Sequence, residues 1–312
     1  MKYLFFFLLL TPGWLIAELS IEEKDTHIEI THNGNTVLSY HKVLMPPPEG
    51  QPKFYERSGF IHPIKSPSGG VVTGIHPADH IHHMGLWHAW VETYHNGHNL
   101  DFWNLKEQTA TVRYYETLRI IRNERRVGFT VRQHHVALAK DGRLERVILE
   151  EDFTILVRAT QNLYLIDHKT VQTNVSKHAL ELPAYRYGGP LAYRGPYHWD
   201  KSNSNYLTSE GKDRNNGHET RARWCAMYGP TGNGDSTIVF MGHPNNHDAP
   251  LRQRIWPETS NGGRIFFNWV PIQEHAWSLE PGKPSEMNFR ILVHDGQPNK
   301  RRIERAWENY TK

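Results

Sequence analysis

Four runs within residues 109–173 decide the fold: TATVRYYETLRII (109–121), RVGFTVRQHHVAL (126–138), RLERVILEEDFTILV (143–157) and LYLIDHKTVQT (163–173). They are rich in β-branched and aromatic side chains, which favour strands. Turn-forming pairs separate them, namely Asn123-Glu124, Asp141-Gly142 and Gln161-Asn162. This spacing predicts a meander of long antiparallel strands.

Shorter strand-like runs flank the meander. Two of them, at 27–31 and 36–40, surround Asn33-Gly34-Asn35, a hairpin signature. Others follow at 237–241, 264–269, 274–279 and 287–293, and only 301–310 has the spacing of an amphipathic helix. The sequence therefore predicts an all-β fold, a large antiparallel β-sandwich with a short C-terminal helix, in a single domain over residues 18–312.

Composition restricts the class of protein. Of the 312 residues, 38% are hydrophobic and 22% are charged, as in a globular protein. The formal net charge of +3 is small for this length and argues against a nucleic-acid partner. A single cysteine, Cys225, excludes an internal disulfide, so the fold must rest on its core.

The N-terminus has the pattern of an export signal. Lys2 precedes an apolar run at 3–10, and Ala17 offers a small residue at a cleavage point. The run is too short to span a bilayer, and no later segment is apolar enough to do so. We expect residues 1–17 to be removed near Ala17 and the mature protein, without a transmembrane segment, to be periplasmic or secreted.

Histidines gather in residues 76–103. Seven of the 21 lie there, interleaved with aspartates and tryptophans: His76, His80, His82, His83, His88, His95 and His98, with Asp79, Asp101, Trp87, Trp90 and Trp103. Imidazole titrates near neutral pH and is the commonest metal ligand in proteins. The segment lies between predicted strands, where binding residues often occur.

Three interpretations of this segment remain open. His80 and His83 could transfer protons on a substrate, with Asp79 or Asp101 orienting them. His80 and His82, on one face of an extended chain, could instead bind a divalent metal with a third ligand. The histidines could also only bond one another and shape a wet cleft, and no cofactor is implied with certainty.

Later residues are candidates for substrate binding and catalysis. Paired glycines at 188–189 let a ligand approach the backbone, and charged and hydroxylated side chains surround them. We expect substrate contacts from His76, Trp87, Arg186, Tyr187, Arg194, His243 and Asn246. Glu274 is the preferred late carboxylate for a catalytic base, with Glu150 and Glu151 as alternatives. The alternatives for the later motifs are a glycine turn at a sheet edge and an asparagine-capped turn.

The motifs together resemble the PmoA-like family of bacterial proteins, often labelled "methane oxygenase PmoA". The resemblance rests on His76-Pro-Ala-Asp-His-Ile-His-His-Met-Gly-Leu-Trp87 and Asp101-Phe-Trp103, followed in order by Tyr187-Gly-Gly189 and the segments 221–224, 243–246, 279–282 and 294–296. Members of the family usually carry Pro and Arg where this chain has Ile81 and Met84. If the Arg of the family contacts an anionic group, we expect this chain to take a different substrate or to lack that contact.

The resemblance implies an architecture akin to the galactose-mutarotase supersandwich, whose members act on sugars. The methane label cannot be literal, because the membrane monooxygenase subunit spans the bilayer several times. The expectation for this chain is an exported carbohydrate-active enzyme that performs hydrolysis, elimination or epimerisation on a small-molecule or oligosaccharide substrate. The alternatives are a metal-dependent hydrolase or oxygenase and a non-catalytic sugar-binding module.

Overall fold

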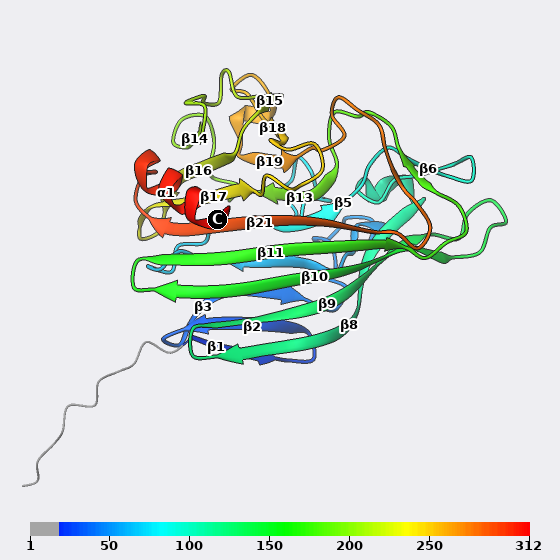
Figure 1. Ribbon diagram of the computed structural model, residues 1–312, viewed down its shortest axis with the longest axis horizontal. Coiled ribbons are helices and arrows are strands. Elements are labelled where there is room, and N and C mark those ends of the chain that lie inside the picture. The colour runs from blue at the N-terminus through cyan, green and yellow to red at the C-terminus, as the bar shows by residue number, and fades with distance from the viewer. Residues whose placement is uncertain (1–18) are drawn as a thin grey trace, which may run out of the picture.

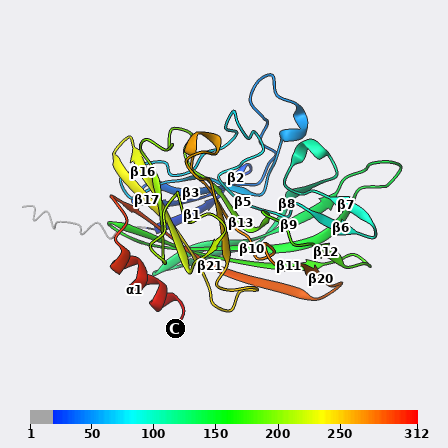
Figure 2. The same cartoon turned by 90° about the horizontal axis from the view of Figure 1, so that it is seen from above.

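The computed structural model of the protein describes residues 19–312, so the predicted export signal lies outside the described residues. Two large antiparallel sheets lie one above the other (Figures 1 and 2). The apolar side chains between them form the main core, which includes Ile30, Tyr40, Phe129, Ile155 and Phe289. The predicted all-β antiparallel sandwich is therefore confirmed.

The predicted meander forms half of the eight-stranded sheet. Strands β8 to β11 pair antiparallel in sequence order, and β21 lies between β11 and β17. The full order is β14-β16-β17-β21-β11-β10-β9-β8. The bounds are β8 Ala110–Asn123, β9 Arg126–Ala137, β10 Arg146–Thr160, β11 Leu163–Asn174, β14 Asn205–Thr208, β16 Trp224–Thr231, β17 Gly234–Gly242 and β21 Pro284–Asp295.

The nine-stranded sheet has the order β1-β2-β3-β4-β5-β13-β19-β18-β15. Its strands are β1 Leu19–Glu23, β2 His27–His32, β3 Asn35–His41, β4 Phe60–Ile64, β5 Leu86–Ala89, β13 Gly189–Arg194, β15 Thr220–Arg221, β18 Arg252–Ile255 and β19 Phe266–Trp269. The predicted hairpin joins β2 to β3, with Asn33 and Gly34 both at positive φ. At the centre, β5, β13 and β19 bring together segments from three distant parts of the chain.

A four-stranded sheet, β20-β12-β6-β7, completes the β structure at one end of the sandwich. Its strands are β6 Thr93–His95, β7 His98–Leu100, β12 Leu180–Leu182 and β20 Trp277–Leu279. Short 3₁₀ helices occupy Lys53–Tyr55, Leu105–Glu107 and Asn261–Gly263. A second apolar cluster, with Trp87, Trp90, Trp103 and Phe266, fills this part of the molecule.

The predicted C-terminal helix is α1, Lys300–Tyr310. The side chain of Asn299 caps it by accepting a hydrogen bond from the backbone N–H of Arg302 at 3.1 Å. Ile303 is buried in a third apolar cluster with Trp224, Val239 and Leu292, so α1 covers the eight-stranded sheet on the face away from the main core. No helix within residues 19–312 combines the length and the apolar character that crossing a membrane requires.

Candidate functional site

The histidine-rich segment lines a pocket with a volume of about 400 Å³. The segment supplies Ala78, Asp79, His80, Ile81, His82, His83 and Trp103 to the lining. Other parts of the chain complete the lining with Tyr55, Asn104, Lys106, Arg186, Tyr187, Arg254, Trp256 and Phe266. Six of the predicted site residues thus share one cavity, namely Asp79, His80, His82, His83, Arg186 and Tyr187.

A compact turn, and not an extended strand, presents the imidazoles. The backbone N–H of His80 donates to Pro77 O and that of His83 donates to His80 O, both at 2.9 Å. His76 closes the turn: its N–H donates to His83 O at 2.9 Å, and its ring Nδ1 lies 2.7 Å from Ile81 O. Gly85 then leads into β5, which begins at Leu86. The premise that His80 and His82 alternate along a strand is therefore wrong.

Four aromatic rings of the lining pack against one another along one wall of the pocket. His83 stacks on His80 with the ring centres 4.8 Å apart and on Phe266 at 5.1 Å. Trp256 packs against His80 at 4.8 Å. Burial lowers the pKa of His83 well below its ordinary value, and burial followed by the charge of His80 lowers the pKa of His82 to about 3. Both imidazoles are therefore neutral at pH 7.

Asp79 is held beside His80 by a buried arginine. Both carboxylate oxygens lie 2.9 Å from Nη2 of Arg194, whose side chain is 1% exposed. The other side of Asp79 faces His80, with Oδ2 3.5 Å from Nδ1. Burial raises the pKa of Asp79, but His80 and Arg194 outweigh burial and hold that pKa well below its usual range. Asp79 is therefore ionised and fixed in place, and Arg194 supports the pocket wall from behind.

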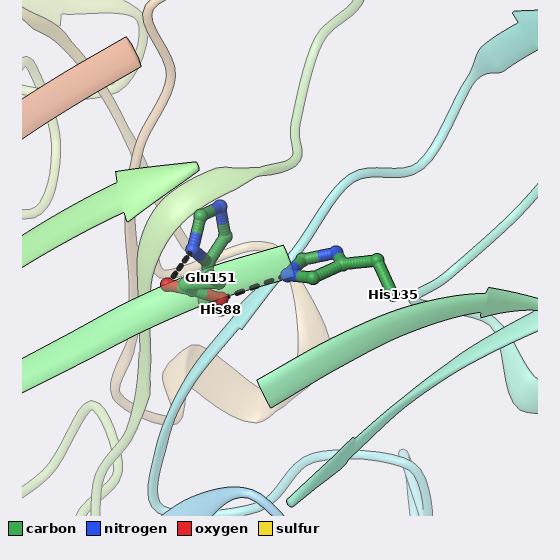
Figure 3. A group of neighbouring side chains, drawn as sticks. All are labelled: His88, His135 and Glu151. Carbon is green, nitrogen blue, oxygen red and sulfur yellow. Dashed lines mark hydrogen bonds and ion pairs between the residues drawn. The ribbon is translucent and has the colours of Figure 1, made fainter. Parts of the chain in front are cut away.

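A second histidine cluster lies in the interior, away from the pocket lining. Glu151 on β10 accepts hydrogen bonds from His88 Nδ1 at 2.6 Å and His135 Nε2 at 2.7 Å (Figure 3). It also accepts one from Thr170 Oγ1 at 2.6 Å. All three titratable side chains are fully buried. Burial raises the pKa of Glu151, but the two histidines lower it well below its usual value. This cluster ties β5 of one sheet to β9 and β10 of the other.

The cluster is also the candidate metal site. Within residues 19–312, one group of three His, Cys, Asp or Glu side chains places its ligand atoms within 4.8 Å of one another, and it consists of His88, His135 and Glu151. Neither His80 nor His82, the pair expected to bind a metal, belongs to it. Two imidazoles and a carboxylate suit zinc. In this arrangement, however, the carboxylate is already satisfied by three donors.

Besides Arg194, three predicted site residues support the pocket without lining it. Asp101 accepts from the backbone N–H of Trp103 at 2.9 Å and from the side chain of Asn104 at 2.7 Å, and the same Asn104 amide donates to Tyr187 at 3.1 Å. Trp87 is buried beneath His83, with the ring centres 5.1 Å apart. His76 closes the turn described above.

The other three lie elsewhere. His243 lines a separate hollow beside Trp307 of α1. Asn246 is buried and bonds the backbone of Asn288 in both directions, as an acceptor at 2.7 Å and as a donor at 2.8 Å. Glu274 pairs with Arg221 at 2.6 Å and with Arg252, which lowers its pKa to about 2. Glu274 is not among the residues that line the histidine pocket.

Sequence reasoning missed Lys106, Arg254 and Phe266 in the pocket and His135 in the interior. Arg254 reaches the pocket from β18, and its guanidinium carbon lies 4.4 Å from the centre of the Tyr187 ring. The one local signal for Arg254 is the Arg-Gln-Arg sequence at 252–254, in which Arg254 comes two residues before Trp256. No local pattern marks Lys106, on the 3₁₀ helix Leu105–Glu107, or His135, on β9, because their roles depend on which distant side chains the fold brings beside them.

Comparison with known proteins gives one family and no curated relative. A family model described as "Family of unknown function (DUF6807)" matches residues 27–308. Among curated proteins, none matches this sequence.

Several solved structures are similar to this one at low sequence identity. A galactose mutarotase-like protein from Lactobacillus casei ATCC 334 is 8% identical, with a TM-score of 0.41 over 89% of this chain and 100% of that one. A galactose mutarotase related enzyme from Lactobacillus acidophilus is 10% identical, with a TM-score of 0.38 over 89% and 98%. Heparan sulfate lyase HepC from Pedobacter heparinus is 8% identical, with a TM-score of 0.36 over 88% of this chain and 34% of the lyase. The chain thus spans about a third of that lyase.

Proposed function

This chain belongs to the family of unknown function DUF6807, and we propose that it is a carbohydrate-active enzyme in which His80 transfers protons on a saccharide bound in the histidine pocket. One observation carries the proposal: a partly exposed imidazole is held beside a fixed carboxylate in a pocket that combines aromatic rings with hydrogen-bond donors. That combination suits a sugar, whose ring has apolar faces and whose hydroxyls seek polar partners.

His80 is the group that can move the proton. Its side chain is 29% exposed, whereas His83 is 2% exposed as a residue and neutral. The carboxylate of Asp79 lies 3.5 Å from Nδ1 of His80 and can orient the ring, and Arg194 prevents the carboxylate from turning away. The ring of His83 stacks on the ring of His80 and limits the orientations that the His80 ring can adopt. Asp79 and Arg194 are thus positioning residues for His80.

The remaining polar groups suit substrate binding. Burial raises the pKa of Tyr187, so its hydroxyl stays protonated and, while accepting from Asn104, can donate to a sugar hydroxyl. Residues of the lining also carry buried polar atoms that no protein atom satisfies, including His83 Nδ1 and Trp256 Nε1. Such atoms cost free energy unless a ligand or water bonds them.

A metal-dependent reaction is the second candidate, because His88, His135 and Glu151 lie together. The surroundings of the cluster count against it. Arg57, itself fully buried, acts on Glu151 as a nearby positive charge, so a divalent cation would add charge to a dry site that already holds its counter-ion. The proposal therefore assigns this cluster a structural role.

The test is turnover of oligosaccharides by the purified protein, with product analysis by NMR. We expect His80→Gln to lower kcat by about 100-fold or more, the usual contribution of a general acid or base, with little change in substrate affinity. His98→Gln, an exposed histidine on β7 that lies outside the pocket lining, is the matched control and should retain full activity.

Equal kcat for wild type and His80→Gln would contradict the catalytic assignment. Sugar binding without any product would favour a binding module. Turnover that is lost on chelation and restored by zinc would favour the metal-dependent alternative.

A further inference from the structure

Two arginines meet at one tyrosine on the wall of the pocket. The guanidinium carbon of Arg254 lies 4.4 Å from the centre of the Tyr187 ring, and that of Arg186 lies 5.4 Å from the same point. Arg254 comes from β18 and Arg186 from the segment before β13, so the fold, and not local sequence, brings the two charges together.

Neither arginine has a carboxylate partner. Within residues 19–312, no ion pair of 4.0 Å or less involves Arg186 or Arg254, although many other arginines of the chain form one. Nη1 of Arg254 is buried and has no hydrogen-bond partner. Burial, and then the charge of Arg186, lower the pKa of Arg254, and the more weakly acting charge of Glu219 only partly opposes them. A partly buried guanidinium that faces a like charge is costly unless an anion compensates it.

The rest of the lining adds positive charge. Lys106 also lines the pocket, and its one ion pair is an exposed contact of 3.8 Å with Glu107. Asp79, the acidic residue of the lining, is already neutralised by Arg194, and His82 and His83 are neutral. The pocket therefore presents three cations with no acidic group free to pair with them.

Stacking on Tyr187 does not remove this requirement. A cation–π contact stabilises one guanidinium by about 0.5–1 kcal/mol at an exposed site, but it leaves the net charge unchanged. An oxyanion would do more, because the planar guanidinium donates two parallel hydrogen bonds to a carboxylate or sulfate group. One such group could contact both arginines.

We propose that Arg186 and Arg254 form an oxyanion subsite, so that the saccharide taken by this pocket is acidic and carries a carboxylate or sulfate group. This inference rests on the proposed carbohydrate function and narrows it to a substrate class. Neutral sugars would bind by stacking and by their hydroxyls alone. An acidic sugar would also place its charged substituent on Arg254, at a fixed position relative to His80.

Calorimetric titration at low ionic strength tests the subsite. The probes are D-galacturonate, D-galactose, galactose 6-sulfate and sodium sulfate. We expect at least one acidic sugar to bind about tenfold or more tightly than galactose, since hydrogen bonds between charged groups are stronger than those between neutral ones. Arg254→Gln and Arg186→Gln should each remove this preference. Arg301→Gln, at an exposed position of α1, should keep it.

The possible outcomes separate the two proposals. Equal affinity for galactose and both acidic sugars would overturn the subsite and leave carbohydrate binding intact. Binding of sulfate at Arg254 with no added affinity from any sugar would support the subsite and overturn the carbohydrate function. Absence of binding by both acidic sugars and by sulfate would overturn the subsite. Arg254→Lys, which keeps the charge, should retain part of the preference, and a thermal melt of each variant shows that it is folded.

Discussion

At the scale of single residues, Glu151 shows how the interior tolerates a charge. The carboxylate accepts three hydrogen bonds, and the buried Arg57 compensates it electrostatically. Burial is unfavourable for each of these groups separately, and their mutual contacts offset that cost. The same contacts join the two sheets next to Trp87, so the cluster positions the pocket wall.

Replacing Glu151 by Gln should therefore destabilise the fold. The amide has the same shape but no charge, so Arg57 loses its counter-ion and one imidazole meets an N–H donor. We expect a loss of about 3 kcal/mol in the free energy of unfolding, as for other broken buried pairs. Urea denaturation at pH 7 measures it.

Glu150 provides the matched control, because it is adjacent on β10 but points to the other face and pairs with Arg132 at 3.3 Å while 35% exposed. Glu150→Gln should change the stability by less than about 1 kcal/mol. A similar small effect for both substitutions would mean that Glu151 is not ionised in the folded state.

The density of histidine identified the pocket from the sequence because six consecutive residues, 78–83, line it and three of them are histidines. Lys106 and Arg254 escaped prediction, since a lone basic residue in a loop or a short strand is usually solvated. From the sequence, Glu274 was also a candidate catalytic base and His243 a candidate substrate contact. Their positions outside the pocket follow from strand order, which no local pattern reveals.

At the scale of elements, the turn before β5 depends on one glycine. Gly85 has a φ of +63°, and a Cβ placed there would lie 2.3 Å from the carbonyl oxygen of Ile61 on β4. The backbone N–H of Gly85 donates to Gly74 O at 2.9 Å, which closes the base of the turn. The imidazoles therefore reach the pocket because the chain can approach β4 closely at this point.

Gly85→Ala should thus cost more than an ordinary glycine substitution. Left-handed backbone alone costs about 1–2 kcal/mol, and the contact with Ile61 adds to it, so we expect a total of about 3 kcal/mol. Gly97→Ala isolates the first effect, because Gly97 has a φ of +76° and a Cβ there would meet no atom within 4 Å. Thermal denaturation compares the two variants. Equal melting temperatures would show that the turn can move away from β4.

The long strands were predictable, and so was the short strand β19, within the run expected at 264–269, whereas the short central strands β5 and β13 were not. In β10 and β11, buried and half-buried residues alternate because one face meets the core and the other is partly open to solvent. In β5 and β13 every residue is buried, so no period of two marks them. The pocket is built around these two strands, which explains why the fold was easier to predict than the site.

At the scale of the whole molecule, buried neutral histidines should make stability depend on pH. Burial lowers the pKa of His168 from 6.5 to about 3 and that of His135 to about 4, and neither nitrogen of His168 has a partner. Between pH 6.5 and 4 the unfolded chain binds protons that the folded chain does not. By linkage, the free energy of unfolding falls as the pH falls through this window.

We expect the free energy of unfolding at pH 4.5 to be about 2 kcal/mol or more below that at pH 7, because each pKa unit is worth about 1.4 kcal/mol. The midpoint of urea denaturation should fall accordingly. His168→Asn should reduce the slope. A midpoint that is constant from pH 7 to pH 4.5 would contradict the neutral state of these side chains.

The floor and the rim of the pocket are under different constraints. His83, Trp103 and Phe266 form the floor and are nearly inaccessible to solvent, whereas Lys106 and Arg186 are exposed on connecting segments. Natural or laboratory variation at the rim can alter which molecule is recognised while the scaffold persists. At the floor, a substitution changes recognition and folding together, so new specificities in this architecture should arise by exchange of the rim.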